Sequence, residues 1–129
     1  MIVDTSAVVA ILKDEPERAA FVEALVAAES LAMSAATYVE LCAVVDRLDN
    51  PAVSRQLDEL IDQFGIDVVD LTVDQARLAR AAYRDFGRGR HPAAFNLGDL
   101  FSYALAAGKR EPLLFKGNDF SQTDIRSAV

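Results

Sequence analysis

Four acidic side chains stand out because each is the only acid in a stretch of mostly apolar residues. They are Asp4 in MIVDTSAVVAIL, Glu40 in AATYVELCAVV, Asp99 in NLGDLFSYALAA and Asp119 in PLLFKGNDF. Burying an ionised carboxylate without a partner costs free energy, so a chain seldom does it four times without a reason. The partner that several buried acids share most readily is a divalent cation that prefers oxygen ligands. The pattern therefore predicts a carboxylate site for Mg²⁺ or Mn²⁺.

The predicted elements can bring these four acids together. Asp4 lies between a short β-branched run and the hydroxyls of Thr5 and Ser6, which is typical of a buried strand that leads into a helix. Asp119 also follows a buried apolar run, and Asp99 falls in the first turn of a helix, where the helix dipole favours an acid. Open α/β sheets bind ligands beyond the carboxyl ends of their strands. We therefore expect the acids to meet at that edge.

Apolar periodicity along the rest of the chain predicts alternating strands and helices. The expected strands are Met1–Val3, Ser30–Met33, Ile66–Leu71 and Pro112–Phe115. The expected helices are Ala7–Leu12, Glu17–Glu29, Ala35–Leu48, Ala52–Phe64, Val73–Phe86 and Leu97–Ala107, with Ser34, Thr72 and Asn96 as N-caps and Gly65 as a C-cap. This alternation indicates an α/β fold with a mainly parallel sheet.

Length and composition set further bounds. A chain of 129 residues, 52% hydrophobic and 26% charged, fits one globular domain over residues 1–129. Its single cysteine, Cys42, lies in an apolar helical run and is interpreted as a core residue. Asp4 stands where a signal peptide would be basic, and no apolar run approaches the roughly 20 residues that span a bilayer. We therefore expect a cytoplasmic protein.

Charge is unevenly distributed along the chain. The net charge is −7, but residues 1–76 carry −11 and residues 77–129 carry +4. The basic excess includes a helical stripe that continues into the following loop, namely Arg77, Arg80, Arg84, Arg88, Arg90 and His91. Two interpretations stay open. The stripe is either a solvated helix face or a surface that meets an anionic partner.

Several motifs together resemble a known family. IVDTSA at the start, a single Glu in a following helix, NLGD before FSYALA, and LLFKGNDF near the end are similar to the motifs of a PIN domain. The likeness is strongest to the VapC toxins of type II toxin–antitoxin pairs, and it covers nearly the whole chain in the expected order. The resemblance implies a three-layer α/β/α fold and a metal-dependent endoribonuclease that cleaves RNA with Mg²⁺ or Mn²⁺.

The resemblance also implies roles for the acids. Asp4 and Asp99 match the principal metal ligands, while Glu40 and Asp119 match the remaining acids, which bind metal directly or through water. Either Glu40 or Asp119 could accept a proton from the attacking water, and the sequence does not choose between them. The hydroxyl that usually sits beside the first Asp corresponds to Thr5 or Ser6.

Other residues near these motifs are supporting candidates. Many PIN domains have Thr or Ser after the last strand, where this chain has Phe115, so Asn118 or Thr123 could supply the missing contact. Asn96 can cap the helix that carries Asp99. Asp124 is a weaker fifth acid, interpreted as turn-forming or as a residue that supports the other acids without binding the metal directly. Lys116 could contact a phosphate or pair with an acid, and the arginine stripe could hold RNA phosphates.

The resemblance implies partners, and two rival functions remain. VapC toxins have a cognate VapB-type antitoxin whose C-terminal segment covers the active site, and they form homodimers that become heterotetramers or larger assemblies with it. The apolar faces of Glu17–Glu29 and Ala52–Phe64 could serve either contact. The rivals are a non-catalytic PIN-like interaction module and a receiver- or phosphohydrolase-type protein. The second rival would need an Asp where Ser6 stands.

Overall fold

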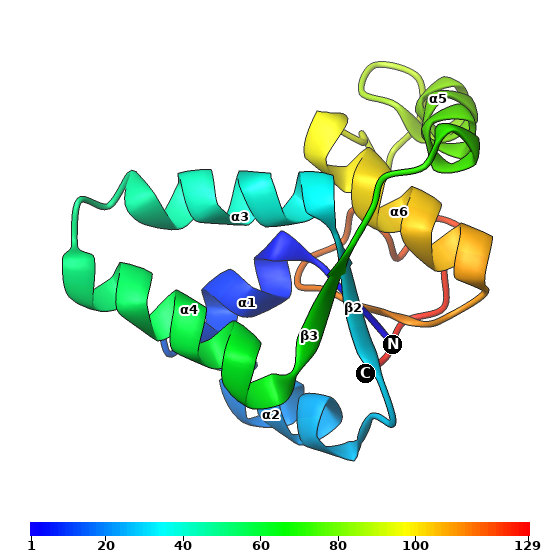
Figure 1. Cartoon of the computed structure of the whole chain (residues 1–129). Helices are drawn as coiled ribbons and strands as arrows, with labels where there is room; N and C mark the ends of the chain where they lie inside the picture. Colours follow the sequence, from blue (N-terminus) through cyan, green and yellow to red (C-terminus); the bar gives the residue numbers. More distant parts are fainter.

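The computed structural model describes residues 1–129 and shows a four-stranded sheet between two layers of helices (Figure 1). The strands are β1 (Ile2–Val3), β2 (Leu31–Ser34), β3 (Ile66–Val69) and β4 (Leu113–Leu114), in the order β3-β2-β1-β4. Every pairing is parallel, with Ile2 opposite both Ala32 and Leu113. The predicted α/β fold with a mainly parallel sheet is confirmed.

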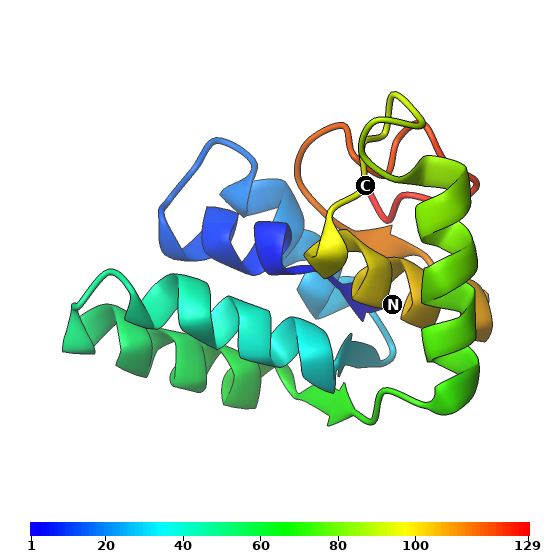
Figure 2. The ribbon, with the colours of Figure 1, turned by 90° about the horizontal axis from the view of Figure 1, so that it is seen from above.

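Six helices connect and cover these strands. They are α1 (Thr5–Leu12), α2 (Arg18–Ala27), α3 (Ala35–Asp46), α4 (Pro51–Phe64), α5 (Val73–Phe86) and α6 (Leu97–Lys109). Successive side chains of a strand point to opposite faces, so each strand supplies two cores. Val3, Met33 and Leu114 pack with α1–α4 on one face. Ile2, Ala32 and Leu113 pack with α5 and α6 on the other. Figures 1 and 2 show the resulting three layers.

The sequence predicted the element boundaries to within two residues. Helix caps explain this accuracy, because the side chains of Ser34, Thr72 and Asn96 accept hydrogen bonds from the first turns of α3, α5 and α6. Gly65 ends α4 with φ of 63°, a conformation that suits glycine. Strand β3 ends at Val69 rather than Leu71, and α3 ends at Asp46 rather than Leu48.

Two further expectations can be compared with the structure. Cys42 is half-buried and packs against the core on the α1–α4 side, in agreement with a core residue. None of the six helices has the length and apolar character that crossing a membrane requires.

Candidate active site

The candidate site lies where the carboxyl ends of β1 and β4 meet the first turns of α1 and α6. Asp4 follows β1 directly, and its backbone N–H donates to the carbonyl oxygen of Leu114 in β4 at 3.0 Å. Glu40 comes from α3, Asp99 from the first turn of α6, and Asp119 from the loop after β4. Figure 2 shows the start of α6, in yellow, beside the start of α1, in dark blue. The parallel sheet thus gathers elements from the whole chain at one edge.

Asp4 is held by three hydrogen-bond donors. The backbone N–H of Ser6 donates to Asp4 Oδ2 at 2.9 Å, and Ser6 Oγ donates to the same oxygen at 2.6 Å. Ser102 Oγ donates to the other oxygen, Oδ1, at 2.5 Å. Ser6 Oγ in turn accepts from the backbone N–H of Lys116 at 3.0 Å. The Asp4 side chain is only 5% exposed, so these donors replace the water that an ionised carboxylate would otherwise need.

Glu40 is fixed against the backbone of α6. Thr5 Oγ1 donates to Glu40 Oε2 at 3.1 Å. A Cβ atom added at Gly98 would lie 2.3 Å from Glu40 Oε1, so the absence of a side chain there makes room for the carboxylate. Burial raises the pKa of Glu40, the Thr5 hydrogen bond partly opposes this, and the charge of Asp4 raises the pKa further.

Asp99 belongs to a capping box at the start of α6. The backbone N–H of Asn96 donates to Asp99 Oδ2 at 2.8 Å, and the backbone N–H of Asp99 donates to Asn96 Oδ1 at 3.0 Å. Burial is the largest cause that raises the pKa of Asp99, and the Asn96 hydrogen bond opposes it. The charges of Asp119, Asp4 and Glu40 also raise this pKa, and the net result is a value of about 6. All three other acids therefore lie close enough to Asp99 to influence its ionisation.

The four carboxylates have no cationic partner. Every Lys, Arg or N-terminal ion pair in the structure involves other acids, namely Asp14, Glu15, Glu17, Asp74 and Glu111. No three acidic, His or Cys side chains stand in an arrangement that would already enclose a metal ion. The chemistry of the donors nevertheless fits a hard divalent cation, since the set consists of oxygen ligands with uncompensated negative charge.

The supporting candidates around the end of β4 contact residues other than the four acids. Lys116 Nζ pairs with Glu15 at 2.5 Å and with Glu17 at 3.1 Å, so its acid partners lie on the α1–α2 loop. Phe115 is buried against Phe120, and Thr123 Oγ1 donates to the Phe120 carbonyl oxygen at 2.7 Å within a turn.

Two more polar groups of the C-terminal segment, those of Asn118 and Asp124, also accept hydrogen bonds within the chain. The carbonyl oxygen of Asn118 accepts from Ser121 Oγ at 2.8 Å. Asp124 accepts from the Tyr103 hydroxyl at 2.8 Å. Asp124 therefore ties the C-terminal segment to α6, and its expected turn-forming role stays a prediction.

Sequence reasoning missed two buried hydroxyls. Ser102 and Thr37 are fully buried, and their oxygens lie 3.3 Å apart between α6 and α3. Each stands three residues from an acid on the same helix face: Ser102 follows Asp99, and Thr37 precedes Glu40. The sequence did contain a signal for these hydroxyls, because each belongs to a polar residue one turn from an isolated acid on an otherwise apolar helix.

Comparison with known families agrees with this architecture. The family model described as PIN domain matches residues 1–126. The chain therefore belongs to the PIN-domain family.

Individual relatives show which members of the PIN-domain family this chain is similar to. The chain is 55% identical over 130 residues to Ribonuclease VapC28 of Mycobacterium tuberculosis, covering 100% of this chain and 98% of the relative. It is 55% identical over 129 residues to VapC ribonuclease Mb2780c of Mycobacterium bovis, covering 99% and 98%. The resemblance to the VapC ribonucleases is confirmed.

Solved structures support the fold. The crystal structure of Mycobacterium tuberculosis VapC20, described as a toxin that cleaves the sarcin-ricin loop, matches with a TM-score of 0.76 and 15% identity, covering 96% of this chain and 95% of that one. A toxin–antitoxin complex from Klebsiella pneumoniae matches with a TM-score of 0.72 and 15% identity, covering 99% and 97%. The expected three-layer PIN fold is confirmed.

Proposed function

We propose that this chain is a metal-dependent endoribonuclease toxin that cleaves RNA phosphodiester bonds. In this proposal Asp4, Glu40, Asp99 and Asp119 hold Mg²⁺ or Mn²⁺. The observation that carries it is the proximity of four acids without a Lys or Arg partner: burial and then the charges of the other three acids raise the pKa of Asp99 to about 6. The PIN-domain match and the names of the VapC relatives support the same activity.

The proposed roles follow from how each side chain is held. The hydroxyls of Ser6 and Ser102 fix the orientation of Asp4. Thr5 and the open space at Gly98 fix Glu40. When bound, the divalent ion supplies positive charge at the scissile phosphate and acidifies the attacking water. Glu40 or Asp119 accepts the proton from that water. Since four acids alone would repel a phosphate, placement of the scissile phosphate at these acids depends on compensation of their charge.

Removal of one carboxylate tests the assignment. Mn²⁺ uptake by the purified chain is measured by calorimetry, and cleavage of total bacterial RNA is measured with Mg²⁺ and with EDTA. Asp99→Asn should abolish both Mn²⁺ uptake and cleavage, while Asp62→Asn, an exposed acid on α4, should change neither. Unchanged cleavage by Asp99→Asn would contradict the proposal. A wild-type chain that neither takes up Mn²⁺ nor cleaves RNA would instead point to a non-catalytic interaction module.

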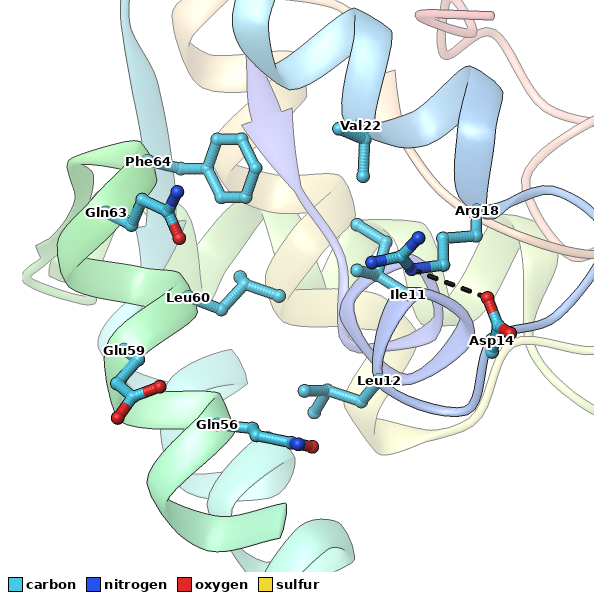
Figure 3. Close-up of a pocket in the computed structure, with 10 residues that line it drawn as sticks. All are labelled: Ile11, Leu12, Asp14, Arg18, Val22, Gln56, Glu59, Leu60, Gln63 and Phe64. Atoms are coloured by element: carbon cyan, nitrogen blue, oxygen red, sulfur yellow. Dashed lines mark ion pairs between the residues drawn. The ribbon is translucent and has the colours of Figure 1, made fainter. Parts of the chain in front are cut away.

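A cognate VapB-type antitoxin is the proposed protein partner, and a groove offers a place for it. A pocket of about 570 Å³ lies between α1, α2 and α4, where Leu12, Val22 and Phe64 face the same space (Figure 3). Arg18 and Asp14 form an ion pair at its rim, with 3.6 Å between Nε and Oδ1. On α2 and α4 the side chains of Phe21, Leu25, Leu57 and Leu60 are buried in the core, but Val22 and Phe64 are only half-buried. An apolar helix of the antitoxin fits such a groove.

Two valines on α2 give a matched test of this contact. Val22→Glu places a charge in the groove and should weaken binding of the co-expressed antitoxin at least about tenfold, since a buried unpaired charge is costly. Val26→Glu alters a side chain that is 72% exposed and outside the groove, so binding should not change. Equal affinities of the two variants in calorimetry would exclude the groove. Sedimentation of the toxin alone and with antitoxin tests the proposed homodimer and heterotetramer.

One autonomous domain and a cytoplasmic location stay predictions. The first is tested by reversible two-state unfolding of the purified chain, the second by fractionation of the cells that produce it.

A further inference from the structure

A second pocket lies beside the carboxylate site. It measures about 520 Å³, within the range of small-ligand pockets, and is formed by α5, by the loop after it and by the first turn of α6. Phe95 and Leu100 are buried and form its floor. Tyr83 is 43% exposed and Leu97 is 70% exposed at its rim. A phenol ring and a leucine that stay open to solvent can pack against a flat apolar ligand.

The same pocket carries positive charge. Arg80 and Arg88 line it, both are exposed, and neither forms an ion pair. Arg77, one turn before Arg80 on α5, is instead paired with Asp74 at 3.2 Å and lies outside the pocket. The pocket lies within residues 77–129, which carry a net charge of +4 against −11 for residues 1–76, so its two unpaired arginines favour an anionic ligand.

Backbone hydrogen bonds hold the pocket against the candidate active site. The backbone N–H of Arg88 donates to the Phe95 carbonyl oxygen at 3.1 Å, and that of Phe95 donates to the Phe86 carbonyl oxygen at 2.8 Å. These bonds close the loop onto itself, beside the start of α6 (Figure 2). Asn96, the next residue, lines the pocket and also caps Asp99. The pocket and the carboxylate site therefore share Asn96 as their border.

We propose that this pocket binds one nucleotide of single-stranded RNA next to the bond that is cleaved, an inference that rests on the proposed ribonuclease activity. The base packs on Tyr83 and Leu97, and Arg80 and Arg88 contact the flanking phosphates. Single-stranded RNA is favoured because proteins bind it with aromatic platforms and basic side chains, whereas bases within a duplex are stacked and inaccessible. The pocket selects unpaired RNA, while the acids perform the cleavage.

Binding is tested without metal, so that it is independent of cleavage. Fluorescence anisotropy in EDTA measures the affinity of the full chain for a labelled single-stranded RNA of mixed sequence, about 12 nucleotides long. Tyr83→Ala should weaken binding about tenfold, and Tyr83→Phe, which keeps the ring, should retain it. An RNA with abasic sites should not distinguish Tyr83→Ala from wild type. Arg80→Ala and Arg88→Ala should each lower the slope of log Kd against log salt by about one, whereas Arg77→Ala should leave it unchanged.

The outcomes separate this inference from the proposed function. If Tyr83→Ala, Arg80→Ala and Arg88→Ala bind RNA as the wild type does while Asp99→Asn still abolishes cleavage, the pocket assignment is wrong and the ribonuclease assignment stands. If Tyr83→Ala instead lowers the sedimentation coefficient without changing RNA affinity, the surface joins two copies of the chain, and the inference is again overturned. Loss of RNA affinity by Tyr83→Ala with unchanged melting temperature and full rescue in Tyr83→Phe supports it.

Discussion

The two sides of the candidate active site hold their carboxylates in different ways. Asp4 is the most buried of the four acids, yet two hydroxyls and one backbone N–H satisfy its oxygens. Glu40 and Asp99 are less buried, each receives a single hydrogen bond, and burial raises the pKa of both. Hydrogen bonds stabilise a buried charge where they are present. Glu40 and Asp99 have fewer hydrogen-bond donors than Asp4, so a bound cation would compensate more negative charge on their side of the site.

This contrast separates structural from electrostatic roles. Asp4 is built into the junction of β1, β4 and α6, so a change there should affect folding as well as chemistry. Asp99 contributes a capping bond but also repulsion, so a change there should affect chemistry without lowering stability.

The largest expected effect is a difference in stability between two variants that both lose cleavage. Asp4→Asn replaces an acceptor oxygen by an NH₂ group that faces donors, which should lower the free energy of unfolding by about 1–3 kcal/mol. Asp99→Asn keeps an acceptor for the Asn96 N–H and removes repulsion, so stability should not fall. Both should lose cleavage about 100-fold or more. Urea unfolding and RNA cleavage measure the two effects, and equal stability losses would contradict the contrast.

Two glycines of α6 give the next test. Gly98→Ala puts a Cβ 2.3 Å from Glu40 Oε1, so the carboxylate must move, and Mn²⁺ affinity and cleavage should fall by up to about 100-fold. At Gly108 the nearest contact of a Cβ is Leu78 Cδ1 at 3.5 Å. Gly108→Ala should therefore leave cleavage unchanged and add up to about 1 kcal/mol of helix stability. If Gly98→Ala cleaves RNA as well as Gly108→Ala does, the position of Glu40 is unimportant for the reaction.

Removal of the hydroxyl at position 102 should have a smaller effect on the Asp4 side. Ser102→Ala leaves Asp4 Oδ1 without its donor, so Mn²⁺ affinity should fall about tenfold, with a matching loss of cleavage. Ser54→Ala removes a similar bond to an exposed acid, Asp46, and should change neither. Calorimetric Mn²⁺ titration distinguishes positioning from stability, because a purely structural Ser102 would alter melting and leave the affinity unchanged.

The sequence predicted some parts of this molecule better than others, for physical reasons. Asp4, Glu40 and Asp99 could be singled out because each is an isolated acid in an apolar run, and burial of a charge is visible from its neighbours. The same pattern was wrong about burial at Asp119, which is exposed because it lies in the loop after β4. The helix boundaries followed from caps such as Ser34 and Asn96, whose hydrogen bonds are local. Such signals need only a few adjacent residues.

Long-range partners were beyond the same reasoning. Lys116 pairs with Glu15 across 101 positions of sequence, and Ser102 reaches Asp4 across 98, so only the assembled sheet brings either pair together. The pocket that includes Tyr83 and Leu97 depends on how the loop closes between α5 and α6. The position of a serine or tyrosine in an amphipathic helix does not show whether its side chain will bond to a distant acid or line a pocket.

The smallest expected effect concerns pH and applies to the Asp99 side alone. The pKa of Asp99 is raised to about 6 from an ordinary 3.8, so the folded chain binds more protons than the unfolded chain between these values. The free energy of unfolding of the metal-free chain should therefore fall as pH rises from about 4 to about 6, by about 1 kcal/mol once solvent screening of this half-exposed group is included. In Asp99→Asn this contribution disappears, and the difference between the two urea-unfolding curves isolates it.

Saturating Mn²⁺ should also remove the fall in stability of the wild type with rising pH, because Mn²⁺ binds the ionised form of Asp99. A wild type and an Asp99→Asn variant with parallel pH profiles would mean that Asp99 carries no uncompensated charge, and the contrast with Asp4 would fail.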